Sequence, residues 1–138
     1  MNIKVSVENG AVPVTVVHVD GDIDASTYEQ FQARLTELID GGTRHMLIDL
    51  SHTPFVSSSG LRALHFAFNK LRENDTANPM SGEEVRRGIS AGTYKSPHLK
   101  LLNPSKETKS TFELSGFDMF IETFDDRQTA LASFHAAS

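Results

Sequence analysis

The chain has 138 residues, of which 38% are hydrophobic, and this is enough for one domain with a core of its own. The absence of cysteine excludes disulfides and thiolate metal sites, and the formal net charge of −5 argues against general nucleic-acid binding. No apolar run is long enough to cross a bilayer, and the N-terminus lacks the layout of a signal peptide. We therefore expect a single domain over residues 1–138, without membrane insertion and with the cytoplasm as its default compartment.

The chain begins with a predicted β-hairpin. Residues 3–8 alternate between apolar and polar side chains, and residues 12–19 are rich in β-branched side chains, so both stretches predict strands. Asn9-Gly10 lies between them and is typical of a two-residue type I′ turn, which needs positive φ angles.

A helix and a central strand are predicted next. Ser26 and Glu29 have the spacing of a capping box, and Gly41-Gly42 is expected to end the helix that follows. Met46–Leu50 is apolar enough to be a strand in the middle of a sheet.

A second amphipathic helix is predicted from about Ser58 to Arg72. Its apolar stripe has helical spacing and consists of Leu61, Leu64, His65, Phe68 and Leu71. Phe66 lies away from that stripe, so it is either covered by another segment or offered to a partner.

The remainder predicts a long polar segment and then alternating strands and helices. Residues 73–97 contain several Asn, Gly and Pro residues, and within them 81–87 have acids first and bases last, as a short helix prefers. The later elements are strands over 99–102 and 120–124, a helix from 103–105 to Leu114 with Gly116 after it, and a last helix capped by Asp125 or Asp126. This order, β-β-α-β-α-β-α-β-α, predicts an α/β fold with a mixed, largely parallel five-stranded sheet and four main helices.

Three consecutive serines, Ser57, Ser58 and Ser59, precede Gly60 at the start of the second helix. One serine is enough to cap the helix, a role that contributes ~1 kcal/mol, so at least one hydroxyl stays free. A free hydroxyl there can accept a phosphate, because the helix N-terminus favours negative charge. The phosphate would repel neighbouring acids, and so it would change partner binding without unfolding the domain.

A catalytic serine is the less favoured alternative. A hydrolase elbow has the pattern Gly-x-Ser-x-Gly, and Val56 stands where the first glycine is needed. Nothing in the sequence fixes His18, His45 or His52 as a general base. The histidine spacing predicts no metal site, and there is no phosphate-binding loop, so we expect no metal and no cofactor.

Four motifs together resemble the STAS domain family, and within it the small anti-sigma factor antagonists. Val19–Asp24 resembles the family's Gly-Glu-Leu-Asp connector, and Met46–Ser51 resembles its third strand. Ser57–Leu61 stands where the family has Asp-Ser-Ser-Gly-Leu, and Phe112–Phe117 resembles its Leu-Ser-Gly-Leu helix end. The resemblance covers nearly the whole chain except residues 73–97, which are an insertion relative to the short antagonists.

The resemblance implies a STAS-like fold and a regulatory role rather than an enzymatic one. It implies that the protein binds an anti-sigma factor that is also a serine kinase, so that a sigma factor is released. By position Ser58 is the phosphoacceptor, and a phosphatase resets the switch. The partner-binding surface that it implies is made of Asp22, Asp24, Ser57, Ser59, Gly60, Arg62 and Phe66.

Two departures from the family pattern bear on this interpretation. Ser57 replaces the aspartate before the acceptor, which makes Ser57 and Ser59 rival acceptors. The insertion at 73–97 is expected to pack over the outer face of the second helix and to cover Phe66. Both departures keep open an alternative, a non-switching STAS scaffold of a stressosome-like assembly or a soluble subunit of a lipid-transport ABC system. Self-association is also left open.

Overall fold

The computed structural model of the chain describes residues 1–75 and 81–134. Five strands form one sheet in the order β1-β2-β3-β4-β5. The first pair is antiparallel and the other neighbours are parallel, as predicted. The strands are β1 (Asn2–Asn9), β2 (Pro13–Asp20), β3 (Met46–His52), β4 (Leu99–Leu102) and β5 (Thr123–Phe124).

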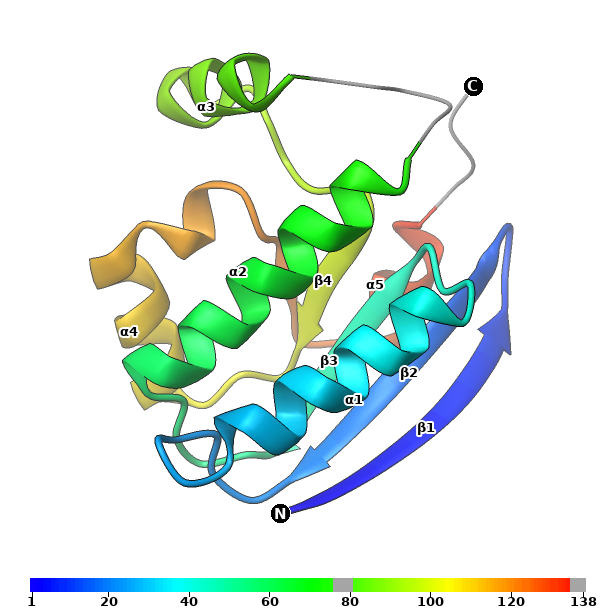
Figure 1. Cartoon of the computed structure of the whole chain (residues 1–138), viewed down its shortest axis with the longest axis vertical. Helices are drawn as coiled ribbons and strands as arrows, with labels where there is room; N and C mark the ends of the chain where they lie inside the picture. Colours follow the sequence, from blue (N-terminus) through cyan, green and yellow to red (C-terminus); the bar gives the residue numbers. More distant parts are fainter. Residues whose placement is uncertain (76–80, 135–138) are drawn as a thin grey trace.

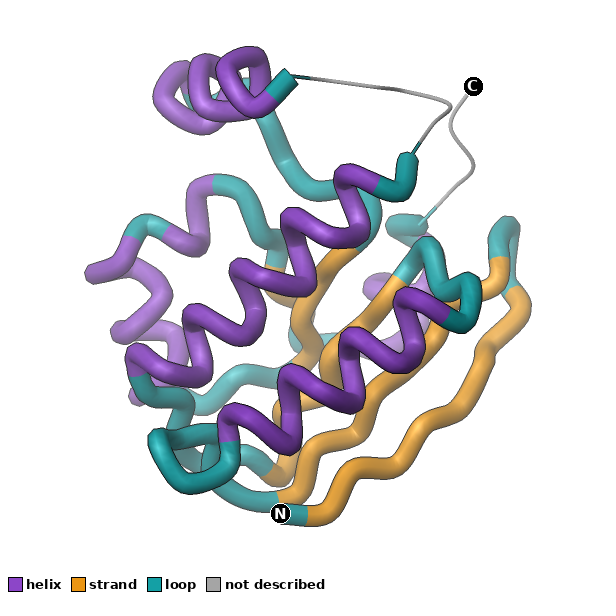
Figure 2. Tube along the Cα trace, viewed as in Figure 1, coloured by secondary structure: helices purple, strands orange, loops and turns teal. Residues whose placement is uncertain are grey.

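Helices cover both faces of this sheet unequally (Figure 1). The two longest, α1 and α2, lie side by side on one face, and the short α5 lies on the other (Figures 1 and 2). The helices are α1 (Tyr28–Asp40), α2 (Ser58–Glu73), α3 (Gly82–Ala91), α4 (Lys106–Ser115) and α5 (Arg127–Ala132), with a 3-10 turn, η1, at Phe117–Met119.

The alternation of side chains along the strands produces one hydrophobic cluster on each face. The larger cluster packs β2, β3 and β4 residues such as Val17, Ile48 and Leu101 against α1 and α2. The smaller one packs Val16 and Leu47 under α5. Because α5 is short, it covers only part of its face, and polar side chains occupy the remainder.

Two local predictions in the first half of the chain are wrong. The hairpin forms, but Asn9 pairs with Pro13, so residues 10–12 make a three-residue loop and neither Asn9 nor Gly10 has the positive φ of a type I′ turn. The capping box at Ser26 does not form either, because the Ser26 hydroxyl donates to the Asp24 carboxylate and α1 begins only at Tyr28.

The predicted fifth strand is shorter than residues 120–124. The N–H groups of Phe120 and Ile121 donate to the carbonyl oxygen of Phe117, which ends the turn η1, so only Thr123–Phe124 pair with β4. Asp126 rather than Asp125 caps α5, and Gly116 ends α4 in the left-handed conformation as expected.

The polar segment at 73–97 contains a well-capped helix, but it does not cover Phe66. In α3 the Ser81 hydroxyl accepts from Glu84 N and the Glu84 carboxylate accepts from Ser81 N. Tyr94, after α3, packs its ring on Phe68, whereas Phe66 stays 42% exposed. The hypothesis of a covered Phe66 is therefore wrong, although residues 76–80 of the segment lie outside the described residues. Within the described part of the chain, no helix is long and apolar enough to cross a membrane.

Candidate functional site

Backbone hydrogen bonds join the serine run at the start of α2 to the acidic connector, which is the segment between β2 and α1. Ile23 forms an isolated parallel bridge with Val56. The Ile23 N–H donates to the Phe55 carbonyl oxygen at 3.0 Å, and the Ser57 N–H donates to the Ile23 carbonyl oxygen at 2.8 Å. These bonds bring together two segments that the sequence separates by more than thirty residues, and they place Asp22 and Asp24 beside the serines.

Ser57 is the residue that caps α2. Its hydroxyl oxygen accepts a hydrogen bond from the N–H of Gly60 at 3.3 Å, and its backbone is extended. A cap of this kind satisfies one of the free N–H groups in the first helical turn. The Ser57 hydroxyl therefore caps the helix, and the hydroxyls of the other two serines do not.

Gly60 lies below the surface, where the first turn of α2 meets the connector. A Cβ atom built on it would lie 2.7 Å from Val56 Cγ1, 2.9 Å from Ile23 Cγ2 and 3.0 Å from the Ile23 carbonyl oxygen. No side chain fits at such distances, so the glycine is needed for the close approach of helix and connector. Its part in the site is to position the serines, since it is buried.

Ser58 begins an exposed stripe along α2. Its hydroxyl has no hydrogen-bond partner among residues 1–75 and 81–134, and the side chain is exposed, whereas Ser59 is half-buried. Arg62 and Phe66 follow at intervals of four residues, which places all three side chains on one face of the helix. The structure thus gathers Ser58, Arg62 and Phe66 on one accessible surface.

The connector contributes two acidic residues of different character. Asp24 is held in place, because its Oδ1 atom accepts from the Ser26 hydroxyl at 2.7 Å and from the Ser26 N–H at 2.9 Å. These hydrogen bonds, with weaker ones from Thr27, lower the pKa of Asp24 below its usual value, so it is ionised at neutral pH. Asp22 is exposed and its side chain has no partner among the described residues.

Two threonines that the sequence analysis did not single out shape this region. The Thr27 hydroxyl donates to the Asp22 carbonyl oxygen and accepts from the Asp24 N–H, so it fixes the curve of the connector. The buried Thr53 hydroxyl donates to the Val19 carbonyl oxygen at 2.8 Å and ties the end of β3 to β2. The sequence Asp24-Ala-Ser-Thr27 is itself a signal, because these residue types make local side-chain bonds in turns.

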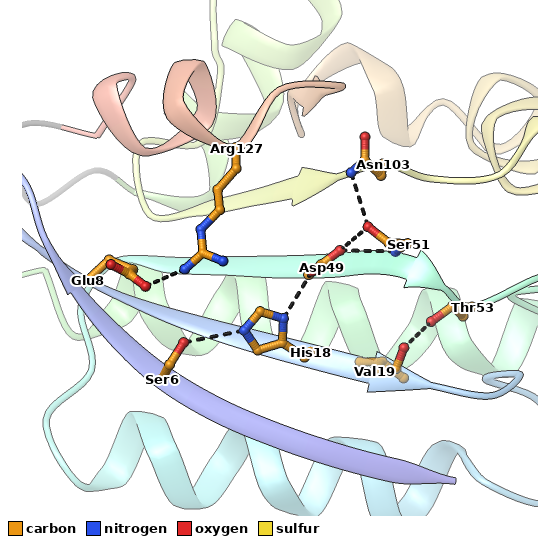
Figure 3. Close-up of polar contacts among 9 residues, drawn as sticks. All are labelled: Ser6, Glu8, His18, Val19, Asp49, Ser51, Thr53, Asn103 and Arg127. Carbon is orange, nitrogen blue, oxygen red and sulfur yellow. Dashed lines mark hydrogen bonds and ion pairs between the residues drawn. The ribbon is translucent and has the colours of Figure 1, made fainter.

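A second polar group lies on the sheet face that α5 leaves uncovered (Figure 3). His18 Nδ1 is 2.9 Å from Asp49 Oδ2, and His18 Nε2 is 3.3 Å from the Ser6 hydroxyl. Asp49 also accepts from Ser51, whose hydroxyl accepts from Asn103. Burial opposes ionisation of Asp49, but the hydrogen bonds from Ser51 and His18 outweigh it and lower the pKa of Asp49.

The histidines considered as general bases are engaged away from the serine run. His18 belongs to the polar group just described, and His45 packs against the rings of Phe134 and His98. His52 lies at the end of β3, in an open groove of about 330 Å³ at the ends of β3 and β4. Within the described ranges, no group of three or more His, Asp or Glu side chains has the arrangement of a metal site.

Comparison with known proteins agrees with this architecture. The family model described as STAS domain matches residues 2–79. BtrV of Bordetella bronchiseptica, a protein named as an anti-sigma factor antagonist, is 27% identical over 119 residues, which cover 86% of this chain and 84% of BtrV.

Two solved structures have the same fold. An anti-sigma factor antagonist from Mycobacterium paratuberculosis has a TM-score of 0.66 at 21% identity, covering 96% of this chain and 93% of that one. The Bacillus cell fate determinant SpoIIAA in its phosphorylated form has a TM-score of 0.60 at 17% identity, covering 95% of this chain and 97% of that one. With its family model, its sheet order and its helix arrangement in agreement, this chain belongs to the STAS domain family and is similar to anti-sigma factor antagonists.

Proposed function

We propose that this protein is an anti-sigma factor antagonist that binds an anti-sigma factor with serine kinase activity and is switched by phosphorylation of Ser58. Binding would free the sigma factor that the anti-sigma factor holds. The observation that carries the proposal is the state of Ser58, an exposed serine with an unbonded hydroxyl in the first turn of a 16-residue helix. SpoIIAA, which has the same fold, has been solved in a phosphorylated form, and this supports the proposal that a protein of this fold can accept a phosphate.

The choice of Ser58 over its two neighbours follows from their surroundings. Ser57 accepts the Gly60 N–H, so its hydroxyl caps the helix, and Ser59 is half-buried. A phosphate on Ser58 would lie near the free N–H groups of the first turn and the positive end of the helix dipole. It would add about −1.5 to −2 charge beside the ionised Asp24, and so it would change the potential of the binding surface while the fold stays intact.

Phosphorylation is tested by incubating the full chain with the anti-sigma factor kinase of its own genome and ATP, followed by mass spectrometry. We expect one phosphate, on Ser58, with no phosphate on Ser58→Ala and normal phosphorylation of the matched Ser59→Ala variant. Phosphate confined to Ser57 or Ser59 would contradict the assignment. Binding of the kinase without any phosphorylation would indicate a non-switching STAS module instead.

Ser57 offers a second, independent test. Aspartate is also a good cap, so Ser57→Asp preserves the first turn of α2 while it restores the acid that the family pattern has there. If that acid assists recognition by the kinase, Ser57→Asp is phosphorylated on Ser58 faster than the natural chain, with unchanged stability. A slower reaction would show that the kinase partner is adapted to serine at this position.

The partner-binding surface is tested with a pair of exposed apolar side chains. Phe66 lies on the stripe that begins at Ser58, whereas Leu114, which is 91% exposed, lies on α4. We expect Phe66→Ala to weaken binding of the anti-sigma factor about tenfold, as removal of a central aromatic contact typically does. Leu114→Ala should leave the affinity unchanged, and an equal effect of both variants would place the interface elsewhere.

A further inference from the structure

β1 is a long edge of the sheet that the described residues leave open. It is the first strand in the order β1-β2-β3-β4-β5, and nothing in the described ranges pairs with its outer side. In Figures 1 and 2 it is the outermost strand, with no described segment beyond it. The opposite edge, β5, has only two residues, which is a common way to protect an edge, whereas β1 has eight.

The side chains of β1 form two chemically distinct rows. Ile3 packs against the core on the helix face, and Val5 and Val7 follow it in the same row, with Val7 58% exposed. Lys4, Ser6 and Glu8 form the other row, on the face where Ser6 bonds His18. Lys4 has no ion-pair partner among the described residues, and Glu8 pairs with Arg127. β1 has no proline and no bulge, so its outer N–H and C=O groups remain available for pairing.

We propose that β1 pairs antiparallel with β1 of a second copy of this chain, with Ser6 facing Ser6 across a twofold axis. In this register Lys4 lies opposite Glu8 of the second copy, and the same pair recurs on the other side of the axis. Val5 lies opposite Val7, so the exposed Val7 side chain gains an apolar neighbour. Opposite residues of an antiparallel pair share a face, so charged side chains meet charged ones and valines meet valines.

The charged side chains of β1 favour this register over the two adjacent registers. A shift that places Val5 opposite Val5 brings Lys4 opposite Ser6 and Glu8 opposite Asn2, so both ion pairs are lost. A shift in the other direction places Val7 opposite Val7 and Glu8 opposite Ser6, with the same loss. Only the arrangement centred on Ser6 matches every charged residue of β1 with its opposite. An interface of this kind is isologous and closes at a dimer.

Reversing the charge of Lys4 or of Glu8 in the full chain tests the interface. We expect sedimentation equilibrium to give twice the chain mass for the natural protein as its concentration is raised. Lys4→Glu and Glu8→Lys each place like charges opposite one another, so each variant alone should weaken self-association about tenfold or more. A mixture of the two variants restores both ion pairs in a heterodimer and should dimerise again. Lys106→Glu, the same charge change on the exposed start of α4, is the matched control and should dimerise normally.

Cross-linking tests the register. The chain has no cysteine, so Ser6→Cys introduces a single thiol at the one position that faces its own copy. Mild oxidation should give a covalent dimer of Ser6→Cys, whereas Thr123→Cys, on the opposite edge of the sheet, should give no covalent dimer. The proposal is overturned if the natural chain is a monomer at the highest concentration that its solubility allows, or if Lys4→Glu dimerises like Lys106→Glu. Circular dichroism of each variant confirms that a loss of association is not a loss of fold. Because Ser58 is not part of β1, Ser58→Ala should dimerise normally, so this test is independent of the proposed switch.

Discussion

The N–H of Ser57 donates to the carbonyl oxygen of Ile23 at 2.8 Å, and this bond fastens the first turn of α2 to the connector after β2. Asp24 follows Ile23 and Ser58 follows Ser57, so this bond, together with that from the Ile23 N–H to the Phe55 carbonyl oxygen, holds the two parts of the proposed site together. Its geometry depends on how closely α2 approaches the connector, and that approach depends on Gly60.

Replacement of Gly60 by alanine should destabilise the fold. The added Cβ would lie within 3.0 Å of Val56, Ile23 and the Ile23 carbonyl oxygen, so the helix or the connector must shift. Overpacking of this kind typically costs about 1–3 kcal/mol in the free energy of unfolding, measured by urea denaturation. The matched control is Gly82→Ala in α3, where the nearest atom is 3.5 Å away at the end of the Arg86 side chain. Equal urea midpoints for the two variants would show that the contact at Gly60 relaxes freely.

At position 103, just after β4, we expect the free energy of unfolding to fall in the order asparagine, glycine, alanine. Its φ of 52° lies in the left-handed region, and its amide donates to the Ser51 hydroxyl at 3.0 Å. Asn103→Gly loses only the hydrogen bond, since glycine adopts this φ without strain. Asn103→Ala loses the bond and adds backbone strain, so we expect a loss of about 1–3 kcal/mol, larger than that of Asn103→Gly. An alanine variant more stable than the glycine variant would mean that the left-handed backbone is not maintained in solution.

The fold was predictable because it depends on periodic patterns, whereas the errors arose where single residues compete for local bonds. The strands and the apolar stripe of α2 follow from residue spacing, except that the fifth strand is shorter than predicted and His65 of the stripe is exposed. The capping box at Ser26 failed because Asp24, two residues earlier, binds the Ser26 hydroxyl first. The hairpin turn departed from Asn9-Gly10 because Pro13 pairs with Asn9 and leaves a longer loop.

The polar contacts of the sheet were not predictable from spacing. His18 and Asp49 are 31 residues apart and meet only because β2 and β3 are parallel neighbours in a particular register. The sequence did place the serine run at a helix N-terminus, but it left open which serine caps. The answer depends on the Gly60 N–H, which is directed at the Ser57 hydroxyl.

His98 should make the protein less stable as the solution becomes mildly acidic. The ring is buried, and although Asp75 lies 2.9 Å from its Nε2 atom, burial prevails and lowers the pKa of His98 below its usual 6.5. The unfolded chain therefore binds this proton more readily than the folded one. The free energy of unfolding should fall as the pH decreases through about 6.5 and level off below the folded pKa.

The variant His98→Gln removes this titration and should reduce the slope between about pH 7.5 and pH 5.5. The slope should not vanish, because partial shielding of the His65 ring from solvent, by the stacked Phe68 ring among others, also lowers the pKa of His65, with the same sign. His52→Gln, at an exposed position, is the control for the histidine-to-glutamine substitution itself. Urea denaturation at a series of pH values measures all three proteins, and an unchanged slope in His98→Gln would contradict the assignment.

Asp49 should stabilise the protein at neutral pH and lose that effect in acid. Its side chain is 16% exposed and accepts hydrogen bonds from His18 and Ser51, which hold its pKa below the usual 3.8. A depressed carboxyl pKa contributes stability above about pH 4, and this contribution disappears as the pH falls through the folded value. Asp49→Asn should therefore be less stable than the natural chain by about 1–3 kcal/mol at neutral pH. The two proteins should converge in acid, where Asp49 is protonated. A difference that persists unchanged below the folded pKa would show that Asp49 acts through its shape and not through its charge.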